Sequence, residues 1–238
     1  MKAIRFEIEG FLNSFRVPFF RTYHKSFLAP PKTTIIGLLC NISLKSQREF
    51  FELLDKELID ISIVIDTIQG KTKDLWSYKT LDKKNRGKSV IRRDKLYAPR
   101  YIVYLKIEDK TLYDEVISGL RDPKNIPSLG LDDELVVIKN ITEIELSKNT
   151  TNRINSVFLD KNLPPYKAFI EDITEIIELP VSNLTPVKFV AFDKKGKRIS
   201  KESVLEFHQV EYRNCQIEFQ DNIETFTDTE LGHGVMFY

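Results

Sequence analysis

The residues most able to do chemistry lie close together near the start of the chain, in a basic and aromatic segment. Arg16, Arg21, Tyr23, His24 and Lys25 follow one another within a short stretch. Lysine and arginine side chains neutralise phosphate groups, and aromatic rings stack on unpaired nucleobases. This combination favours a site for single-stranded nucleic acid over a pocket for a small molecule.

The elements on either side of this segment would present its side chains. Residues 2–10 alternate between apolar and charged side chains, which predicts a half-buried strand. The run PPKTT at 30–34 then leads into an apolar stretch that predicts a helix over 33–42. A helix N-terminus has free backbone N–H groups and partial positive charge, so it can hold a phosphate. We therefore expect Lys32 and Thr33 to belong to the same binding site.

A second basic segment spans residues 71–100 and contains 11 basic and 3 acidic residues. Alternating stretches at 75–81 and 90–97 flank the polar turn 82–87, a pattern typical of a β-hairpin. A hairpin that only needed to be soluble would not need eight excess positive charges. We expect it to contact nucleic acid through cations and stacking rings, namely Trp76, Tyr78, Lys79, Lys88, Arg92, Arg93 and Lys95. The alternative for Trp76 and Tyr78 is that their rings pack on the sheet.

The charge of the whole chain is polarised. Its formal net charge is only +1, but residues 1–100 contain 20 Lys and Arg against 11 Asp and Glu, a net of +9. Residues 101–238 contain 16 against 24, a net of −8. Such a chain can present one face to a polyanion and another to basic protein neighbours.

The hydrophobic content, the cysteine spacing and the short apolar runs together predict a cytoplasmic protein. Hydrophobic residues make up 42% of the chain, enough for a substantial core. Cys40 and Cys215 are far apart and lack metal-ligand spacing, so we expect both to be reduced and buried. No apolar run approaches ~18 residues, and the first residues do not form a signal peptide.

With the hairpin set aside, the first 146 residues predict the order β-α-β-β-α-β, which is that of a ferredoxin-like (RRM-like) α+β domain. The predicted strands span 2–10, 61–68, 101–107 and 135–146, and the predicted helices 33–42, 46–58 and 110–120. A polar run at 147–155 and Pro164-Pro165 mark a change of organisation. We expect residues 147–238 to form a β-rich subdomain with strands near 174–179, 187–192, 204–212 and 216–219.

Three features of the chain resemble the Cas-five family of the RAMP superfamily. The first combines Ser14-Phe15-Arg16 and Thr22-Tyr23 with the run PPKTTIIGLL at 30–39. The second is the basic hairpin, which resembles the thumb of that family. The third is PSLGLDDEL at 127–135, which is similar to its P-L-G-x-x-D-E-L pattern. Together these features cover residues 1 to about 140.

The resemblance implies a non-catalytic subunit of a type I CRISPR interference complex, known as Cascade. Such a subunit grips and caps the 5′ handle of the CRISPR RNA and contacts the Cas-seven backbone subunit and the large subunit. It meets target DNA only indirectly, because the guide RNA reads the target by base pairing. The resemblance implies no cofactor, no metal, no membrane and a location in a prokaryotic cytoplasm.

An alternative comes from the type I-C branch of the same family, which cuts precursor CRISPR RNA without metal. If this chain were such an endoribonuclease, Tyr23, His24 and Lys25 would be its catalytic residues, because histidine titrates near neutrality. Two other histidines are expected elsewhere, His208 in a C-terminal strand and His233 in a flexible tail. The hairpin carries no histidine, which argues against catalysis.

Two further classes of protein are alternatives to these. A generic single-stranded RNA-binding module outside CRISPR systems would share the same cations and rings. A metal-dependent enzyme finds no support, because no carboxylates or histidines show ligand spacing. The acidic run at 132–134 lies between a predicted turn and a strand, so we interpret it as turn capping.

Overall fold

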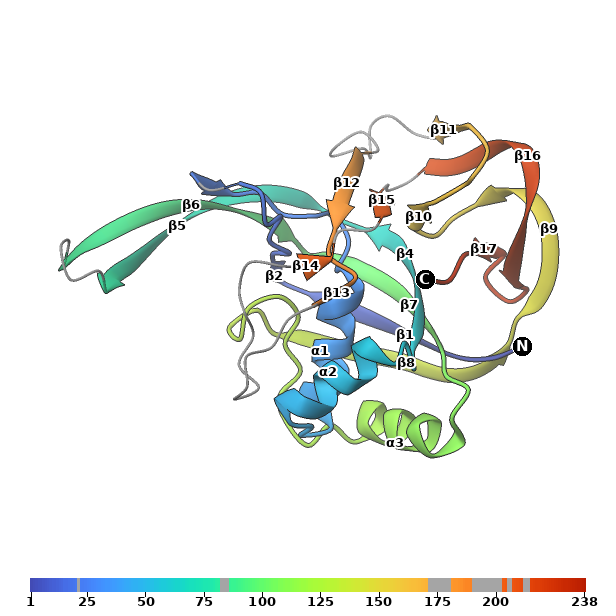
Figure 1. Ribbon diagram of the computed structural model, residues 1–238, viewed down its shortest axis with the longest axis horizontal. Coiled ribbons are helices and arrows are strands. Elements are labelled where there is room, and N and C mark those ends of the chain that lie inside the picture. The colour runs from blue at the N-terminus through green and yellow to red at the C-terminus, as the bar shows by residue number, and fades with distance from the viewer. Residues whose placement is uncertain (21, 82–85, 171–180, 190–202, 205–206, 212–214) are drawn as a thin grey trace.

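A four-stranded antiparallel sheet forms the centre of the molecule in the computed structural model, which describes all residues except 21, 82–85, 171–180, 190–202, 205–206 and 212–214 (Figure 1). Its strand order is β4-β7-β1-β8. The strands are β1 (Lys2–Gly10), β4 (Asp60–Thr67), β7 (Arg100–Lys106) and β8 (Val136–Glu145). The alternation read from the sequence is confirmed for β1, where Ile4, Phe6 and Ile8 are fully buried.

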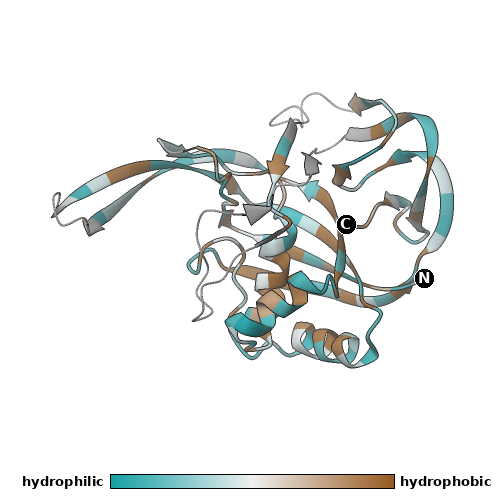
Figure 2. Ribbon diagram, viewed as in Figure 1, coloured by the Kyte–Doolittle hydropathy of each residue, from teal (hydrophilic) through white to brown (hydrophobic). Residues whose placement is uncertain are grey.

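Helices cover one face of this sheet (Figures 1 and 2). They are α1 (Lys32–Ile42), α2 (Gln47–Asp55) and α3 (Lys110–Arg121). The apolar side of α1 is buried in the main core, whereas α2 begins with a capping box between Ser46 and Glu49. Such a box satisfies backbone N–H groups that a helix start leaves unpaired. The second predicted helix ends earlier than expected, at 55 rather than 58.

A long hairpin projects from the body of the molecule (Figure 1). It consists of β5 (Gly70–Leu81) and β6 (Arg86–Tyr97), and both strands are longer than predicted. The opposite edge of β6 pairs with β2 (Leu12–Asn13) and, in parallel, with β3 (Tyr23–His24). The basic segment near the N-terminus is therefore attached to the base of the hairpin through backbone pairing.

The rest of the chain is largely strands. β16 pairs with β9, β11 and β17; β15 pairs with β10 and β12; and β13 pairs with β14. Their bounds are Ser147–Ile154 (β9), Phe158–Asp160 (β10), Tyr166–Ile170 (β11), Val181–Thr185 (β12), Lys188–Phe189 (β13), Ser203–Val204 (β14), Phe207–Glu211 (β15), Cys215–Asp228 (β16) and His233–Val235 (β17). The polar run at 147–155 is thus mostly a strand, which was not predicted. The strand expected at 174–179 lies outside the described residues.

β16 and β17 pack on the face of the central sheet opposite the helices, whereas β13 contacts α2. Tyr104, Val64 and Ala3 from the sheet form an apolar cluster with Leu146 and Val235. The structure is therefore a mixed α/β fold with many antiparallel strands. The proposed division at residue 146 stays a prediction. Within the described part of the chain, no helix is long and apolar enough to cross a membrane.

Candidate nucleic-acid interface

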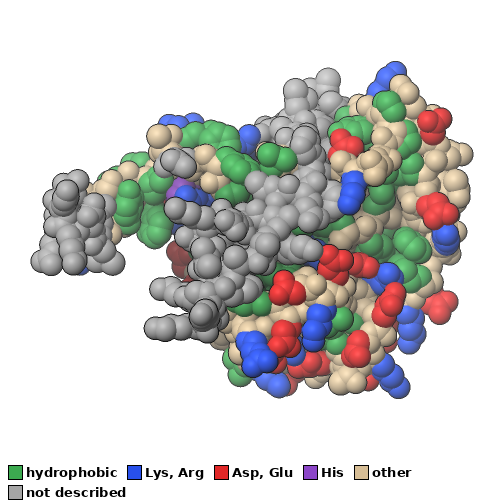
Figure 3. Space-filling model, in the orientation of Figure 1, with side chains coloured by type: hydrophobic (Ala, Val, Ile, Leu, Met, Phe, Trp, Pro, Cys, Tyr) green, Lys and Arg blue, Asp and Glu red, His purple; other side chains and the backbone are tan. Residues whose placement is uncertain are grey.

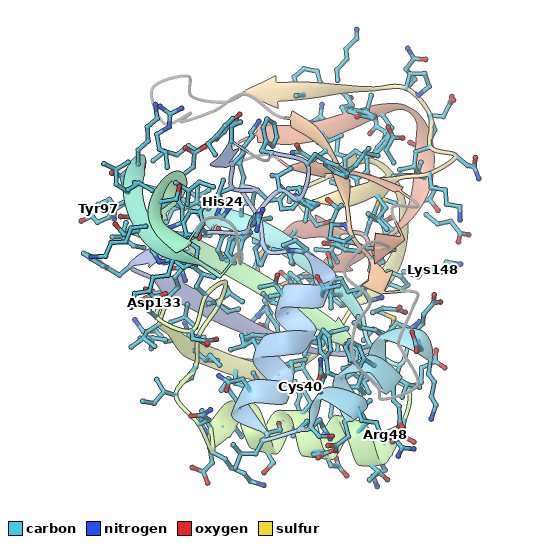
Figure 4. All side chains as sticks on the ribbon, turned by 60° about the vertical axis from the view of Figure 1, so that its left-hand side comes forward. His24, Cys40, Arg48, Tyr97, Asp133 and Lys148 are labelled. Carbon is cyan, nitrogen blue, oxygen red and sulfur yellow. The ribbon has the colours of Figure 1, made fainter. Side chains whose placement is uncertain are left out.

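A hollow of about 220 Å³ lies where the N-terminal loop, the base of the hairpin and the turn before β8 meet. We call it the cationic pocket. It collects residues from all three segments, and they are Ser14, Phe15, Arg16, His24, Lys25, Thr34, Trp76, Arg93, Asp94, Gly130 and Leu131. Figure 3 shows a histidine beside basic side chains where the hairpin leaves the body, and Figure 4 shows His24 at the base of the hairpin.

A short backbone ladder presents Arg16 and Lys25 to the pocket. The N–H of Val17 donates to the carbonyl of Lys25 over 2.8 Å, and the N–H of Phe27 donates to the carbonyl of Phe15 over 2.8 Å. Phe15, Val17 and Phe27 are buried, so their side chains anchor the ladder in the core. The alternating residue Arg16 is exposed, as the period of a strand requires.

The pairing of β3 with β6 separates the neighbours Tyr23 and His24. His24 lies opposite Arg93 and its ring centroid is 6.4 Å from that of Trp76. Tyr23 lies opposite Arg92, and its ring is 4.9 Å from that of Phe20. Successive side chains of a strand point to opposite faces. His24 therefore lines the cationic pocket and Tyr23 lies on the other side. Lys25 follows the end of β3 and also lines the pocket.

Trp76 is the aromatic wall of the pocket. The guanidinium of Arg93 lies over its ring at 4.8 Å from the centroid, in a cation–π arrangement. Asp74 accepts a hydrogen bond of 3.1 Å from Nε of Arg93, which fixes the guanidinium. Trp76 is still 43% exposed, and the exposed Tyr78 ring lies 6.2 Å away. Part of the Trp76 ring is thus accessible for stacking.

Burial lowers the pKa of His24, and the nearby charges of Arg16 and Arg93 lower it further. His24 is therefore harder to protonate in the free protein than an ordinary histidine. An anion that enters the pocket would offset the repulsion from the two arginines. Binding of a phosphate near His24 would accordingly favour its protonation.

A second basic surface lies on the opposite face of the hairpin. Lys79 and Lys88 are directly paired across the two strands, and Arg92 follows on the same side. All three are exposed. Arg92 also lies over the Tyr23 ring, at 5.7 Å from its centroid. These expected contacts face away from the cationic pocket.

Three of the residues expected to bind nucleic acid lie elsewhere, and a fourth cannot be placed. Lys95 is buried and its Nζ is 2.8 Å from Oε1 of Glu134, while Lys32 is buried with its Nζ 3.8 Å from Oδ1 of Asp60. Burial lowers the pKa of Lys32. Thr33 lines a different hollow, and Arg21 lies outside the described residues. We therefore leave Lys95 and Lys32 out of the interface, because neither lines the cationic pocket and their charges face carboxylates inside the protein. Arg93 is also buried and paired with Asp74, but it lines the pocket and lies over the Trp76 ring.

Glu134 holds the three sides of the cationic pocket together. Its carboxylate accepts hydrogen bonds from the N–H of Ser14 (2.7 Å), the hydroxyl of Ser14 (2.6 Å) and the N–H of Leu131 (3.1 Å), as well as from Lys95. Gly130 has φ +110°, and a Cβ there would lie 2.2 Å from Glu134 Oε2. The bond to Leu131 confirms turn capping for Glu134. The run at 127–135 indicated turn capping, but the sequence did not show which groups donate hydrogen bonds to Glu134.

Neither His233 nor Cys40 is among the residues that line the pocket. His233 was expected in a flexible tail, but this was wrong, because it lies in β17 with Nδ1 3.1 Å from the Tyr104 hydroxyl. His208 lies in β15 as expected. Cys40 is buried and free, and burial raises its pKa to about 12. Among the described residues, no group of His, Cys, Asp and Glu is arranged to hold a metal.

The fold resembles those of solved CRISPR proteins. A CRISPR protein from Archaeoglobus fulgidus aligns with 99% of this chain and 98% of its own, with a TM-score of 0.53 and 13% identity. A chain of a CRISPR RNA-guided surveillance complex aligns with 96% of this chain and 92% of its own, with a TM-score of 0.50 and 12% identity. A third structure, of a Cas protein, aligns with 56% of this chain and 58% of its own at 19% identity and a TM-score of 0.40. No curated protein sequence matches the chain.

The fold thus belongs to the class found in CRISPR proteins. The sequence profile of the family described as CRISPR-associated protein (Cas_Cas5) matches residues 3–153. This chain belongs to that family, as the motifs at 14–39 and 127–135 indicated.

Proposed function

We propose that this protein is a non-catalytic RNA-binding subunit of a type I CRISPR interference complex, in which it grips and caps the 5′ handle of the CRISPR RNA. One observation carries the proposal. Arg16, His24, Lys25, Trp76 and Arg93 come from segments far apart in the sequence, yet they line one pocket in a member of this family. Cations and a stacking ring at one point suit a splayed single strand.

The size and position of the pocket support a grip on the RNA backbone rather than a long groove. A volume of about 220 Å³ suits one phosphate with part of its nucleotide. The strand would continue over the hairpin, where Lys79, Lys88 and Arg92 supply positive charge on the far face. In the complex, the Cas-seven backbone subunit and the large subunit would be the protein neighbours, and guide RNA would read the target DNA.

The sheet topology supports the finer assignment of the fold. We infer that β1, α1, β4, β7, α3 and β8 form a ferredoxin-like RAMP domain with α2 added after the first helix and the hairpin inserted between β4 and β7. The order β4-β7-β1-β8 with antiparallel neighbours is the order that such a domain requires.

The arrangement of the N-terminal loop supports a role without catalysis. RNA cleavage by this group would need Tyr23, His24 and Lys25 to converge on one phosphate, with one group as base and another as acid. Tyr23 instead faces Phe20 and Arg92 on the other side of the β3–β6 ladder. His24 is left with cations and an indole ring around it.

Binding to repeat-derived RNA tests the proposal most directly. We expect Arg16→Ala to weaken binding and to reduce the slope of log affinity against log salt by about 0.7, the value for one contact to single-stranded nucleic acid. Arg48→Ala is the matched control, because Arg48 is an exposed cation on α2, away from His24 (Figure 4). An equal change of slope in both variants would contradict a site at the pocket.

Incubation of precursor CRISPR RNA with the protein in EDTA tests the absence of catalysis. We expect intact RNA after prolonged incubation. Specific cleavage by the wild-type protein that is lost in His24→Ala would replace the proposal with the endoribonuclease alternative. Cleavage that survives in His24→Ala would point to a contaminating nuclease.

A further inference from the structure

A second hollow of about 420 Å³ adjoins the cationic pocket. The two share Thr34 and Gly130, so they meet at the N-terminal turn of α1 and the turn before β8. We call the second one the polar hollow. Its chemistry differs from that of its neighbour, because no lysine or arginine is among the described residues that line it.

The polar lining of this hollow is available for a ligand. The hydroxyls of Thr33, Thr34 and Ser128 and the carboxylate of Asp132 form no side-chain hydrogen bond within the part of the chain that the structure describes. By contrast, the Asn41 amide is engaged, because it donates to the carbonyl of Ile126 over 2.9 Å and accepts from Asn125. A ligand here would meet hydroxyls and one carboxylate.

Part of the lining of the hollow is apolar. Leu38 and the Phe50 ring supply apolar surface, and Gly37 leaves space where other residues would carry a side chain. A Cβ on Gly37 would have only the Phe50 ring within reach, at 3.9 Å. A planar ring can therefore lie against α1 and beside Phe50.

We propose that the polar hollow binds a guanine base of the RNA strand whose phosphate lies in the cationic pocket. This inference rests on the proposed function. An ionised carboxylate only accepts hydrogen bonds, and its two oxygens match two donors side by side. Guanine presents N1–H and the N2 amino group in that arrangement, and the Asp132 carboxylate is the group that would accept them.

The same chemistry disfavours other occupants. A phosphate would meet the Asp132 carboxylate without a compensating cation in the hollow. Uracil presents one N–H between two carbonyl oxygens, so it would place an acceptor against a carboxylate. A base without two adjacent N–H donors leaves a carboxylate oxygen without a hydrogen bond once water is excluded, which is unfavourable.

A base scan tests the preference. The probes are fluorescein-labelled oligouridylates of about eight nucleotides, within the site size of single-strand binders, each with one guanosine at a different position. We expect one position at which guanosine raises affinity about tenfold over uridine, as a good bidentate contact does. Inosine at that position lacks the N2 amino group and should lose most of the gain.

Two matched variants assign the preference to the hollow. Asp132→Asn should abolish the gain from guanosine, whereas Asp133→Asn should retain it. Both variants remove one negative charge from the same exposed turn, but only Asp132 lines the hollow. Loss of the preference in both variants, or in neither, would overturn the proposal.

Filling the hollow gives a test that is independent of charge. Gly37→Leu puts a side chain into the space beside Phe50 and improves the helix propensity of α1, so the variant should fold. We expect it to bind guanosine-containing and plain oligouridylate equally. Unchanged preference in this variant would exclude the hollow, even if Asp132→Asn had an effect.

The outcomes separate this inference from the proposed function. If none of the oligonucleotides binds and repeat RNA does not bind either, the RNA-binding proposal itself fails. If RNA binds with the salt dependence of the cationic pocket but no position favours guanosine, only the polar hollow is wrong.

Discussion

Two buried carboxylates, Glu134 and Asp228, use the same chemistry in different parts of the molecule. Glu134 accepts from Lys95, from a serine hydroxyl and from backbone N–H groups. Asp228 accepts from Arg5 over 2.7 Å, from the Tyr104 hydroxyl over 3.0 Å and from backbone N–H groups. Each side chain is nearly inaccessible to solvent, so each charge depends on its partners.

What differs is the set of segments that each carboxylate joins. Glu134 joins the N-terminal loop, the hairpin and the turn before β8, which are the three walls of the cationic pocket. Asp228 joins β1 and β7 to the end of β16, on the face of the sheet that the C-terminal strands cover. We infer that loss of Glu134 affects stability and RNA binding together, whereas loss of Asp228 affects stability alone.

The largest effect is expected for Glu134→Ala. This change leaves Lys95 buried without its carboxylate and removes the acceptor for Ser14, so we expect a loss of about 3–5 kcal/mol in the free energy of unfolding. Urea denaturation measures this loss. At a temperature where the variant is still folded, its affinity for repeat RNA should also fall. Glu134→Gln keeps the side-chain volume and one acceptor oxygen, so it should cost less.

A smaller effect is expected for Asp228→Ala. Arg5 retains Glu230, whose Oε2 lies 2.7 Å from its guanidinium, so the loss should be about 2 kcal/mol, typical of hydrogen bonds to a charged group. Affinity for repeat RNA should not change once the protein is folded. A fall in affinity as large as that in Glu134→Ala would contradict the separation of the two regions.

Acidification should weaken the Asp228 region progressively. Burial alone would raise the pKa of Asp228, but hydrogen bonds from Arg5 and Tyr104 outweigh it and hold the pKa below its usual value, while burial lowers the pKa of His233. Both pKa values are lower in the folded state, so the unfolded chain binds protons more tightly and stability falls as pH falls. The contribution of His233 to the free energy of unfolding is lost as the pH falls below about 6.5. The contribution of Asp228 is lost below about pH 4.

Urea midpoints measured across this range check the expectation. His233→Gln should flatten the dependence between neutral pH and about pH 5, because glutamine has no proton to gain there. His24→Gln is the matched control, and it should leave the contribution of His233 intact. If His233→Gln leaves the pH dependence of the urea midpoint unchanged, burial of His233 does not contribute to that dependence.

The smallest effect is expected in the pH dependence of RNA binding. The pKa of His24 is lowered in the free protein, and a bound phosphate would raise it, so binding should tighten by a few-fold as pH falls below about 6.5. Fluorescence anisotropy at constant ionic strength measures this trend. His24→Gln should remove it, whereas His233→Gln should not. The opposite sign in the wild-type protein would place the phosphate away from His24.

Much of the N-terminal fold could be predicted because its signals are local. The alternation of Ile4, Phe6 and Ile8 depends on neighbours two residues apart, and the apolar run after Pro31 marks α1 directly. The hairpin was predicted from a polar turn between alternating stretches. The separation of Tyr23 from His24 required knowledge of the β3–β6 pairing, which joins distant segments.

Three features of the structure have physical causes that a single sequence does not reveal. The partners of Lys95 and Lys32 are Glu134 and Asp60, well separated along the chain, so neither ion pair could be found from spacing. The polar strand β9 has most of its side chains exposed and is held by backbone pairing with β16, which polar composition does not indicate. His233 is ordered by contacts with Tyr104, a residue of the central sheet.

The parallel pairing of β3 with β6 also has a mechanical meaning. Tyr23 and His24 are paired with Arg92 and Arg93, and the loop that follows β3 leads into α1. A force applied along the hairpin would act along the paired strands β3 and β6. The loop after β3 would transmit this force to α1, so the hairpin would not bend at its base. Tension in a bound strand would therefore be borne by the whole body of the protein.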